Sequence, residues 1–116
     1  MLLSVIVPCY NEEENVPIFY EEMMKNSDFL EREGLDLEII YIDDGSKDAT
    51  AAEVKKLHEK DGRVHLVSFS RNFGKEAGIY AGFQKSKGDY VVMMDVDLQD
   101  PPSLLPEMFS LSLIHI

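Results

Sequence analysis

The sequence has few residues of several types, and each shortage excludes a class of structure or partner. It has no tryptophan, and its single cysteine, Cys9, excludes an internal disulfide and is compatible with a reducing compartment. No apolar run approaches the roughly 20 residues of a membrane-spanning helix, and residues 1–8 lack the basic segment of a signal peptide. Cationic residues number 11 against 22 acidic ones, and the net charge of −11 opposes nucleic acid as a partner.

Short apolar runs alternate with helical patterns along the whole chain. The runs predict strands over residues 2–7, 37–42, 64–69 and 90–94, with a helix after each. The first helix, capped by Asn11 or Asn15, is predicted to continue until Gly34. This order predicts an α/β fold in which a Rossmann-like parallel sheet has helices on both faces. Such sheets bind ligands beyond the carboxyl ends of their strands.

Polar clusters follow all four predicted strands. They are Pro8–Glu12, Asp43–Ser46, Ser70–Lys75 and Asp95–Asp97. A solvated loop explains each cluster singly, but it explains less well why all four are expected at one edge of the sheet.

Asp95 and Asp97 follow an apolar strand and are separated by one residue. Alternate residues of an extended chain point the same way, so both carboxylates can face one point in space. Two like charges at that separation require a cation, a raised pKa or full solvation. Oxygen ligands at the end of a parallel strand suit Mg²⁺ or Mn²⁺ shared with a substrate phosphate, and the alternative is an acidic solvated turn.

The Asp43–Ser46 segment is a second candidate site. Gly45 permits a tight turn with positive φ, and the carboxylates of Asp43 and Asp44 can accept hydrogen bonds from ribose hydroxyls or a base. The alternative is an Asx turn that supports the next helix. We expect Asp48 to have that structural role, and one of Asp43 and Asp44 to contact a ligand.

Arg71 and Lys75 flank a predicted helix start, where backbone N–H groups and two cations favour an anion such as a diphosphate. The alternative is a pair of surface bases. Tyr10 can stack on a base or fill the end of the first strand. Cys9 has no histidine near it in sequence, which favours a small buried residue over a nucleophile.

Three glycines, Gly74, Gly78 and Gly82, recur at every fourth position and share one face of the third predicted helix. An interior glycine costs a helix roughly 1 kcal/mol relative to alanine. The spacing therefore predicts close packing of this helix on the sheet. Neither the phosphate-loop motif nor the dinucleotide glycine motif occurs, which argues against a nicotinamide enzyme.

Four segments carry a resemblance to a known family: residues 5–12, 42–46, 70–75 and 94–102. Together they are similar to family 2 glycosyltransferases of the GT-A fold. They are most similar to the polyprenyl-phosphate branch, which contains dolichol-phosphate mannosyltransferases and bactoprenol glucosyltransferases. The resemblance implies that residues 1–109 are the nucleotide-sugar-binding part of a GT-A domain.

The resemblance also implies metal-dependent, inverting transfer of a sugar from a UDP- or GDP-sugar to a polyprenyl phosphate or a similar acceptor. Asp95, Asp97 and Gln99 would hold Mg²⁺ or Mn²⁺, and Arg71 and Lys75 would lie near the phosphates or on the acceptor side. Because the acceptor phosphate is already anionic, no strong general base is required. The residues on the nucleotide side would be Pro8, Tyr10, Glu12, Asp43, Asp44 and Asp95.

Residues 110–116 do not resemble what usually follows in this family, and they indicate a truncation or a foreign tail. We therefore expect the chain to bind its donor, to be catalytically incomplete, and to expose apolar surface near the fourth strand that favours a homo-oligomer. We expect a cytoplasmic location, or the cytoplasmic face of a membrane in the full-length protein, where the lipid-phosphate acceptor would be met.

Two functions of other classes stay open. The first is a nucleotide-sugar-binding module without its own catalysis. The second is a receiver-like signalling domain, which is also α/β with an acidic metal pocket. A receiver requires an acidic pair after the first strand and a phosphorylatable aspartate after the third. The chain instead has Pro8–Tyr10 and Ser68–Ser70 at those places, which disfavours a receiver.

Overall fold

The computed structural model describes residues 1–94 and residue 96, apart from the side chain of Lys75. Its elements in chain order are β1 (Leu2–Cys9), α1 (Asn15–Met24), α2 (Ser27–Arg32), β2 (Asp36–Asp43), α3 (Thr50–Lys60), β3 (Val64–Ser68), α4 (Lys75–Lys85) and β4 (Tyr90–Met93). The helical stretch expected after residue 100, the domain limit at residue 109 and the tail lie outside the described residues. None of the described helices is long and apolar enough to cross a membrane.

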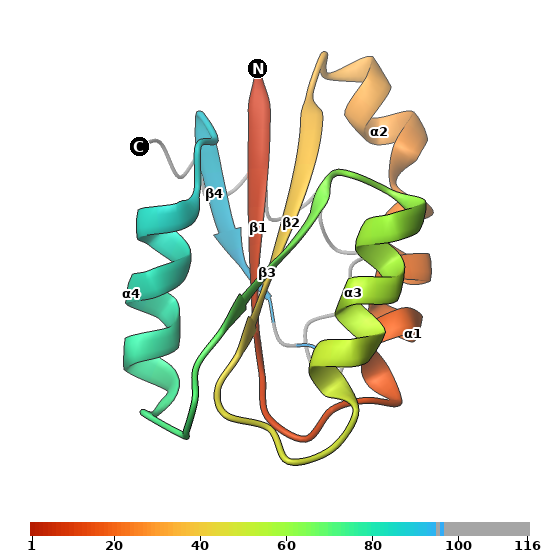
Figure 1. Ribbon diagram of the computed structural model, residues 1–116. Coiled ribbons are helices and arrows are strands. Elements are labelled where there is room, and N and C mark those ends of the chain that lie inside the picture. The colour runs from red at the N-terminus through yellow and green to blue at the C-terminus, as the bar shows by residue number, and fades with distance from the viewer. Residues whose placement is uncertain (95, 97–116) are drawn as a thin grey trace.

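The four strands form one parallel sheet in the order β3-β2-β1-β4 (Figure 1). This is the order of a Rossmann half-fold, whereas receiver domains have the order 2-1-3-4-5. The predicted parallel α/β architecture is confirmed, and the order excludes the receiver alternative. Cys9, Asp43 and Ser68 are paired in one row, so β1, β2 and β3 end at the same level.

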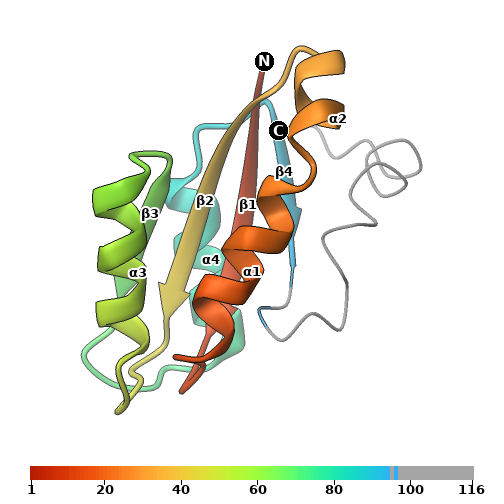
Figure 2. The same cartoon turned by 90° about the vertical axis from the view of Figure 1, so that its right-hand side faces the viewer.

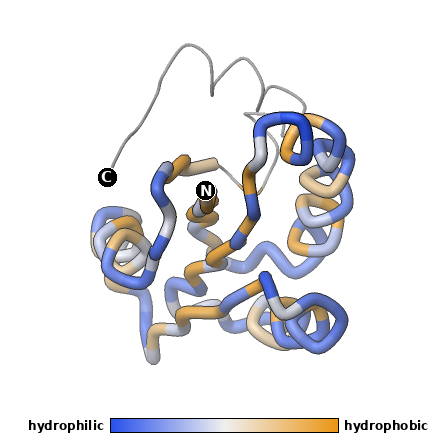
Figure 3. Tube along the Cα trace, turned by 90° about the horizontal axis from the view of Figure 1, so that it is seen from above, coloured by the Kyte–Doolittle hydropathy of each residue, from blue (hydrophilic) through white to orange (hydrophobic). Residues whose placement is uncertain are grey.

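Helices cover both faces of the sheet, as predicted (Figure 2). Alternate strand residues such as Ile39 and Tyr41 pack in the core beneath α1, α2 and α3. The residues between them, such as Ile40 and Ile42, form a smaller core beneath α4. The view along the strands shows the sheet between these two layers (Figure 3). Burial of both faces explains why β2 is a nearly continuous apolar run rather than an alternating one.

The strand limits differ from the prediction by one or two residues at β1, β2, β3 and β4. The largest difference is at β1, which continues through Pro8 to Cys9. A proline has no N–H to donate, and it is tolerated where one side of a strand has no neighbour. The pairing of β4 with β1 runs from Leu3 to Ile6, so Pro8 lies beyond it.

The region between residues 15 and 33 is two helices, not the single helix that was predicted. The chain turns at Lys25 and Asn26, where the N–H of Asn26 donates to the carbonyl of Met23 and the hydroxyl of Ser27 donates to that of Met24. The side-chain amide of Asn26 also donates to the carbonyl of Met23, at 3.4 Å. Serine and asparagine side chains compete in this way with helix continuation. The predicted caps of α1 are also wrong, because Glu14 is the N-cap residue and its side chain makes no capping bond.

The glycine spacing in α4 has the predicted use. A Cβ on Gly82 would lie 2.5 Å from Cγ2 of Ile6, and one on Gly78 would lie 3.2 Å from Cγ2 of Ile42. The helix therefore approaches β1 and β2 more closely than alanine would allow at position 82. Gly74 differs, because no heavy atom lies within 4 Å of its Cβ position.

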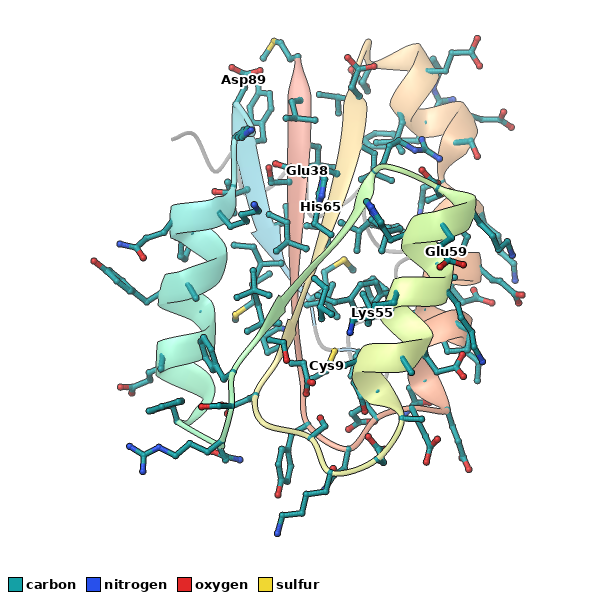
Figure 4. All side chains as sticks on the ribbon, viewed as in Figure 1. Cys9, Glu38, Lys55, Glu59, His65 and Asp89 are labelled. Carbon is teal, nitrogen blue, oxygen red and sulfur yellow. The ribbon has the colours of Figure 1, made fainter. Side chains whose placement is uncertain are left out.

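Glu38 is a buried carboxylate near the start of β2, on the face of the sheet that α4 covers (Figure 4). It accepts hydrogen bonds from the hydroxyl of Ser4 and from the N–H of Lys87 at 2.9 Å. Nε2 of His65 lies 3.6 Å from its other oxygen. These partners satisfy a charge that would be costly to bury alone, and they lie far from the carboxyl ends of the strands.

Candidate functional site

The polar clusters after β1, β2 and β3 meet at one edge of the sheet, at the lower end of Figure 1. Three loops form this edge: residues 10–14, 44–49 and 69–74. In a sheet of order 3-2-1-4 the ligand crevice is expected between β1 and β4, where the strand order reverses. The first loop leaves the sheet directly beside that point.

Asn11 ties the first loop to the second. Its backbone N–H donates to the hydroxyl of Ser46 at 2.8 Å, and its side-chain oxygen accepts the N–H of Lys47 at 2.9 Å. Asn11 has φ of +53°, a left-handed conformation that asparagine tolerates better than most residues. Sequence reasoning assigned Asn11 no role in joining loops, although its tolerance of that conformation was a usable signal.

Asp48 supports the start of α3, as predicted. Its carboxylate accepts the N–H of Thr50 at 2.9 Å and the hydroxyl of the same residue, and it accepts the N–H of Glu13 at 3.3 Å. Burial raises the pKa of Asp48, but the bonds from Thr50 and Glu13 outweigh it and hold the pKa below its ordinary value. The N-cap position itself belongs to Ala49, rather than to Asp48 or Thr50.

Asp43 is the last residue of β2 and is 3% exposed. One carboxylate oxygen accepts the N–H of Ser46 at 2.9 Å, which closes the turn at Gly45. The hydroxyl of Ser68 lies 3.5 Å from the other oxygen. The turn-forming role considered for this segment is therefore present, and ligand contact by Asp43 stays a prediction.

Asp44 joins the second loop to the third. Its two carboxylate oxygens accept the N–H groups of Phe73 at 2.8 Å and Gly74 at 3.0 Å, and the side chain is 7% exposed. Gly45 has φ of +72°, and a Cβ there would lie 2.2 Å from the carbonyl carbon of Arg71. Two of the amides expected to face an anion at the start of α4 thus donate to Asp44.

Arg71 is exposed at this edge, and its guanidinium carbon lies 4.7 Å from the centre of the Phe73 ring. That ring meets Phe69 edge-on at 5.5 Å between centroids. The Arg71 guanidinium therefore packs on the Phe73 ring, which in turn contacts Phe69. Lys75 is the first residue of α4, and its side chain is outside the described part of the structure.

The β1 exit presents Pro8, Tyr10 and Glu12 to the same edge. Tyr10 is 42% exposed, so its ring is accessible for stacking, and its contact with a base stays a prediction. Glu12 is half-buried and accepts a hydrogen bond from the side-chain amide of Asn15 at 2.7 Å. Cys9 is 3% exposed (Figure 4). Burial, and then the nearby Asp43, raise its pKa far above the ordinary thiol value, which fits an inert thiol.

The expected metal ligands Asp95, Asp97 and Gln99 lie outside the described residues. Just before them, the N–H of Met94 donates to the carbonyl of Ile6 at 3.0 Å, so the chain follows β1 toward the crevice edge. Among residues 1–94 and 96, no group of three or more His, Cys, Asp and Glu side chains could hold a metal ion. A metal site would therefore need the carboxylates that follow Met94, and their side-chain oxygens are a donor set that suits Mg²⁺ or Mn²⁺.

A sequence profile of the family described as "Glycosyl transferase family 2" matches residues 4–112. The chain is 44% identical over 108 residues to the "Prophage bactoprenol glucosyl transferase homolog" of Escherichia coli (strain K12), which covers 93% of this chain and 34% of that protein. It is 40% identical over 109 residues to the "Undecaprenyl-phosphate 4-deoxy-4-formamido-L-arabinose transferase" of Pseudomonas aeruginosa (strain LESB58), covering 92% of this chain and 31% of that protein. The chain thus spans about a third of the length of these relatives.

Solved structures share the fold. The mannosyltransferase PcManGT from Pyrobaculum calidifontis, in complex with GDP-Man and Mn²⁺, superimposes with a TM-score of 0.73 at 24% identity, over 89% of this chain and 30% of that one. S. aureus TarS 1-349 in complex with UDP-GlcNAc superimposes with a TM-score of 0.71 at 25% identity, over 95% of this chain and 30% of that one. The family profile, the sequence relatives and the fold agree, and the chain belongs to glycosyl transferase family 2.

Proposed function

We propose that this chain is the donor-binding part of a glycosyltransferase that moves a sugar from a UDP- or GDP-sugar to a polyprenyl phosphate. The observation that carries the proposal is the likeness, over more than nine-tenths of the chain, to proteins named for bactoprenol and undecaprenyl phosphate. The arrangement of three polar loops around the β1 edge supports it, because that edge borders the expected ligand crevice.

The nucleoside would lie against the β1 exit. The exposed ring of Tyr10 offers a stacking surface, and Pro8 and Glu12 lie two residues before and after it in the chain. Carboxylate oxygens of Asp43 and Asp44 lie at the next strand exit, where they could accept a ribose hydroxyl or a base N–H. Aromatic stacking is tolerant of base identity, so this arrangement is compatible with either a uridine or a guanosine donor.

The diphosphate would lie toward Arg71 and Lys75 on one side and Asp95, Asp97 and Gln99 on the other. A chain of net charge −11 repels a diphosphate unless cations offset its field. A divalent ion held by the three latter residues would act as a Lewis acid that stabilises the departing diphosphate. The structural neighbour in complex with GDP-Man and Mn²⁺ supports this assignment.

The reaction would be a single inverting displacement. An oxygen of the acceptor phosphate attacks the anomeric carbon of the sugar while the bond from that carbon to the diphosphate oxygen breaks. The new bond is a sugar–phosphate ester, and the nucleoside diphosphate leaves with the electron pair. Because the attacking oxygen is anionic, the role of Arg71 and Lys75 is to stabilise charge rather than to remove a proton.

Calorimetry tests the donor site first. UDP and GDP are titrated in Mn²⁺ and in EDTA, and we expect affinity that is largely lost in EDTA. Asp97→Asn should abolish the metal-dependent part, whereas Asp36→Asn removes the same charge from an exposed residue at the opposite edge and should have no effect. Equal affinity of the unmodified chain with and without metal would contradict a metal-held diphosphate.

Transfer is tested separately, with labelled nucleotide sugars and undecaprenyl phosphate in detergent. Donor binding with measurable transfer supports the full proposal. Donor binding without transfer by this chain supports the alternative, a nucleotide-sugar-binding module. An absence of binding to every UDP- and GDP-sugar tested would overturn both.

A further inference from the structure

The strand that leads to the expected metal ligands has little in its own sequence to fix its register. Within the described sheet β4 is an edge strand, and it pairs with β1 from Leu3↔Tyr90 to Ile6↔Met93. Residues 90–94 are all apolar, and helices cover both faces of the sheet. A slip by one residue exchanges the two faces of a strand, and here either face would still present apolar side chains. The apolar pattern therefore specifies the register of β4 only weakly.

Polar contacts just before β4 supply what the pattern lacks. One carboxylate oxygen of Glu38, on β2, accepts the hydroxyl of Ser4 and the backbone N–H of Lys87, the latter at 2.9 Å. Asp89 is joined to Leu2 twice. Its N–H donates to the carbonyl of Leu2 at 2.8 Å, and its carboxylate accepts the N–H of Leu2 at 2.9 Å. The chain that enters β4 is thus attached to both β1 and β2.

Close packing at Gly88 makes the attachment specific for one register. A Cβ at position 88 would lie 2.4 Å from Oγ of Ser4 and 2.8 Å from its nitrogen. No other glycine lies within five residues of Gly88 in the sequence, so a slip would bring a side chain against Ser4. Ser4 and Glu38 are both buried and have little room to move aside. We call Ser4, Glu38 and residues 87–89 the β4 clamp.

The register of β4 determines where the chain leaves the sheet. Strand residues rise about 3.3 Å each, so a slip of two residues would move the chain after Met94 by about 7 Å. At present the N–H of Met94 donates to the carbonyl of Ile6 at 3.0 Å, and β1 continues from there to Cys9. Mg²⁺ requires oxygen ligands at about 2.1 Å in near-ideal geometry. A slipped strand would therefore not bring carboxylates to the same ion.

We propose that Ser4, Glu38 and Gly88 are positioning residues for the metal site. By fixing the register of β4 at its start, the β4 clamp sets where the ligands that follow the strand reach the crevice beside β1. The proposal rests on the proposed function in taking those ligands to be Asp95, Asp97 and Gln99. The clamp itself contacts neither donor nor metal, because Glu38 and its partners lie far from the carboxyl edge (Figure 4).

Backbone NOEs between β1 and β4 measure the register without any ligand. In the unmodified chain an NOE should join Ser4 to Val91, its partner in the sheet. Gly88→Ala should remove this NOE or replace it by one to a neighbouring residue. The matched control is Gly62→Ala, because a Cβ there meets no heavy atom within 4 Å, and it should leave the NOE unchanged. Full retention of the NOE in Gly88→Ala would overturn the clamp.

Substitution of Glu38 separates hydrogen bonding from charge. Glu38→Met removes both acceptor oxygens at similar volume, so the N–H of Lys87 and the hydroxyl of Ser4 lose their partner. This variant should lose the NOE between Ser4 and Val91. Glu38→Gln keeps a side-chain oxygen that can accept both bonds, and it should keep the NOE. Retention of the NOE in both variants would overturn the role of Glu38. If Glu38→Met does not fold, Gly88→Ala makes the same test of the clamp.

Calorimetry then tests whether the register acts on the metal site. UDP and GDP are titrated in Mn²⁺ and in EDTA, and we expect Gly88→Ala to weaken the metal-dependent part of the affinity roughly tenfold or more. Leu57→Ala is the control for stability, because it opens a cavity in the other core, beneath α3. It should lower the melting temperature and keep the metal-dependent affinity. Equal weakening by Leu57→Ala, or none by Gly88→Ala, would overturn the proposal. If the unmodified chain binds neither diphosphate, the proposed function fails, and the NOE experiment still decides the clamp.

Discussion

Gly34 and Gly45 allow the cost of one close contact between loops to be isolated. Both adopt the left-handed region, with φ of +66° and +72°. A Cβ at Gly34 would have no heavy atom within 4 Å, whereas a Cβ at Gly45 would lie 2.2 Å from backbone of Arg71. Replacing each glycine by alanine therefore imposes a similar backbone penalty, and the two variants differ in the contact alone.

The magnitudes follow from these two terms. The left-handed conformation costs an L-residue about 1–2 kcal/mol, so Gly34→Ala should lower the free energy of unfolding by about 1 kcal/mol. For Gly45→Ala the loop at Arg71 must retreat from 2.2 Å to an ordinary contact of at least 3.4 Å, a shift of about 1 Å. Backbone atoms cannot rotate away as a flexible side chain can. Overpacking of this kind costs about 1–3 kcal/mol, which should be the difference between the variants.

Urea denaturation of the two variants and the unmodified chain measures this difference. A matching measurement of UDP and GDP affinity tests its consequence, because a displaced loop carries Arg71 with it. We expect Gly45→Ala to lose affinity and Gly34→Ala to keep it, since Gly34 lies between α2 and β2 at the opposite edge. Equal destabilisation by both substitutions would refute the close approach of the two loops.

Four further predictions concern single residues. Asp48→Ala should lower the free energy of unfolding by about 0.5–2 kcal/mol at pH 7. Hydrogen bonds hold the pKa of Asp48 below its ordinary value. Its contribution to stability is therefore present above the ordinary aspartate pKa and is lost as pH falls through the lower, folded-state pKa. If urea denaturation shows the same loss of stability for Asp48→Ala at pH 7 and in strong acid, the assignment is contradicted. Gly82→Ala should be less stable than Gly78→Ala in the same assay, because both gain roughly 1 kcal/mol of helix propensity but position 82 meets Ile6 at 2.5 Å. Cys9 should react with a disulfide reagent only as fast as the chain unfolds, since burial and Asp43 raise its pKa; rapid labelling of the native chain would exclude this. Tyr10→Ala should weaken UDP or GDP binding roughly five- to hundredfold by loss of stacking with no change in melting temperature, and unchanged affinity would remove Tyr10 from the site.

Hydrophobic patterning was sufficient to predict the fold because the sheet is covered on both faces. Residues 39–42 are apolar without alternation, and such a run is typical of a central parallel strand. The break between α1 and α2 was missed for a local reason. The apolar stripe passes across Asn26 and Ser27, and the side chains that turn the chain there are also common on exposed helix surfaces.

The position of the site could be predicted more readily than the partners of its residues. Strand exits in a parallel sheet share an edge, so a pattern of strands followed by polar clusters places the clusters together. The hydrogen bonds from Phe73 and Gly74 to Asp44 link residues 29 and 30 positions apart, and no local pattern indicates them. In the sequence, a carboxylate next to Gly45 looks the same whether its oxygens bind a ligand or accept hydrogen bonds from another loop.

At the carboxyl edge of the sheet, some polar side chains are buried and others are exposed. Asp43 and Asp44 are nearly buried and accept N–H groups of the loops, whereas Tyr10 and Arg71 are exposed. Carboxylates fixed by backbone amides set the loop conformations before a ligand arrives, so binding requires little reorganisation of the protein. The negative charge nearest the strand ends is thereby partly neutralised by amide dipoles, which lowers the repulsion that a diphosphate would meet in so acidic a chain.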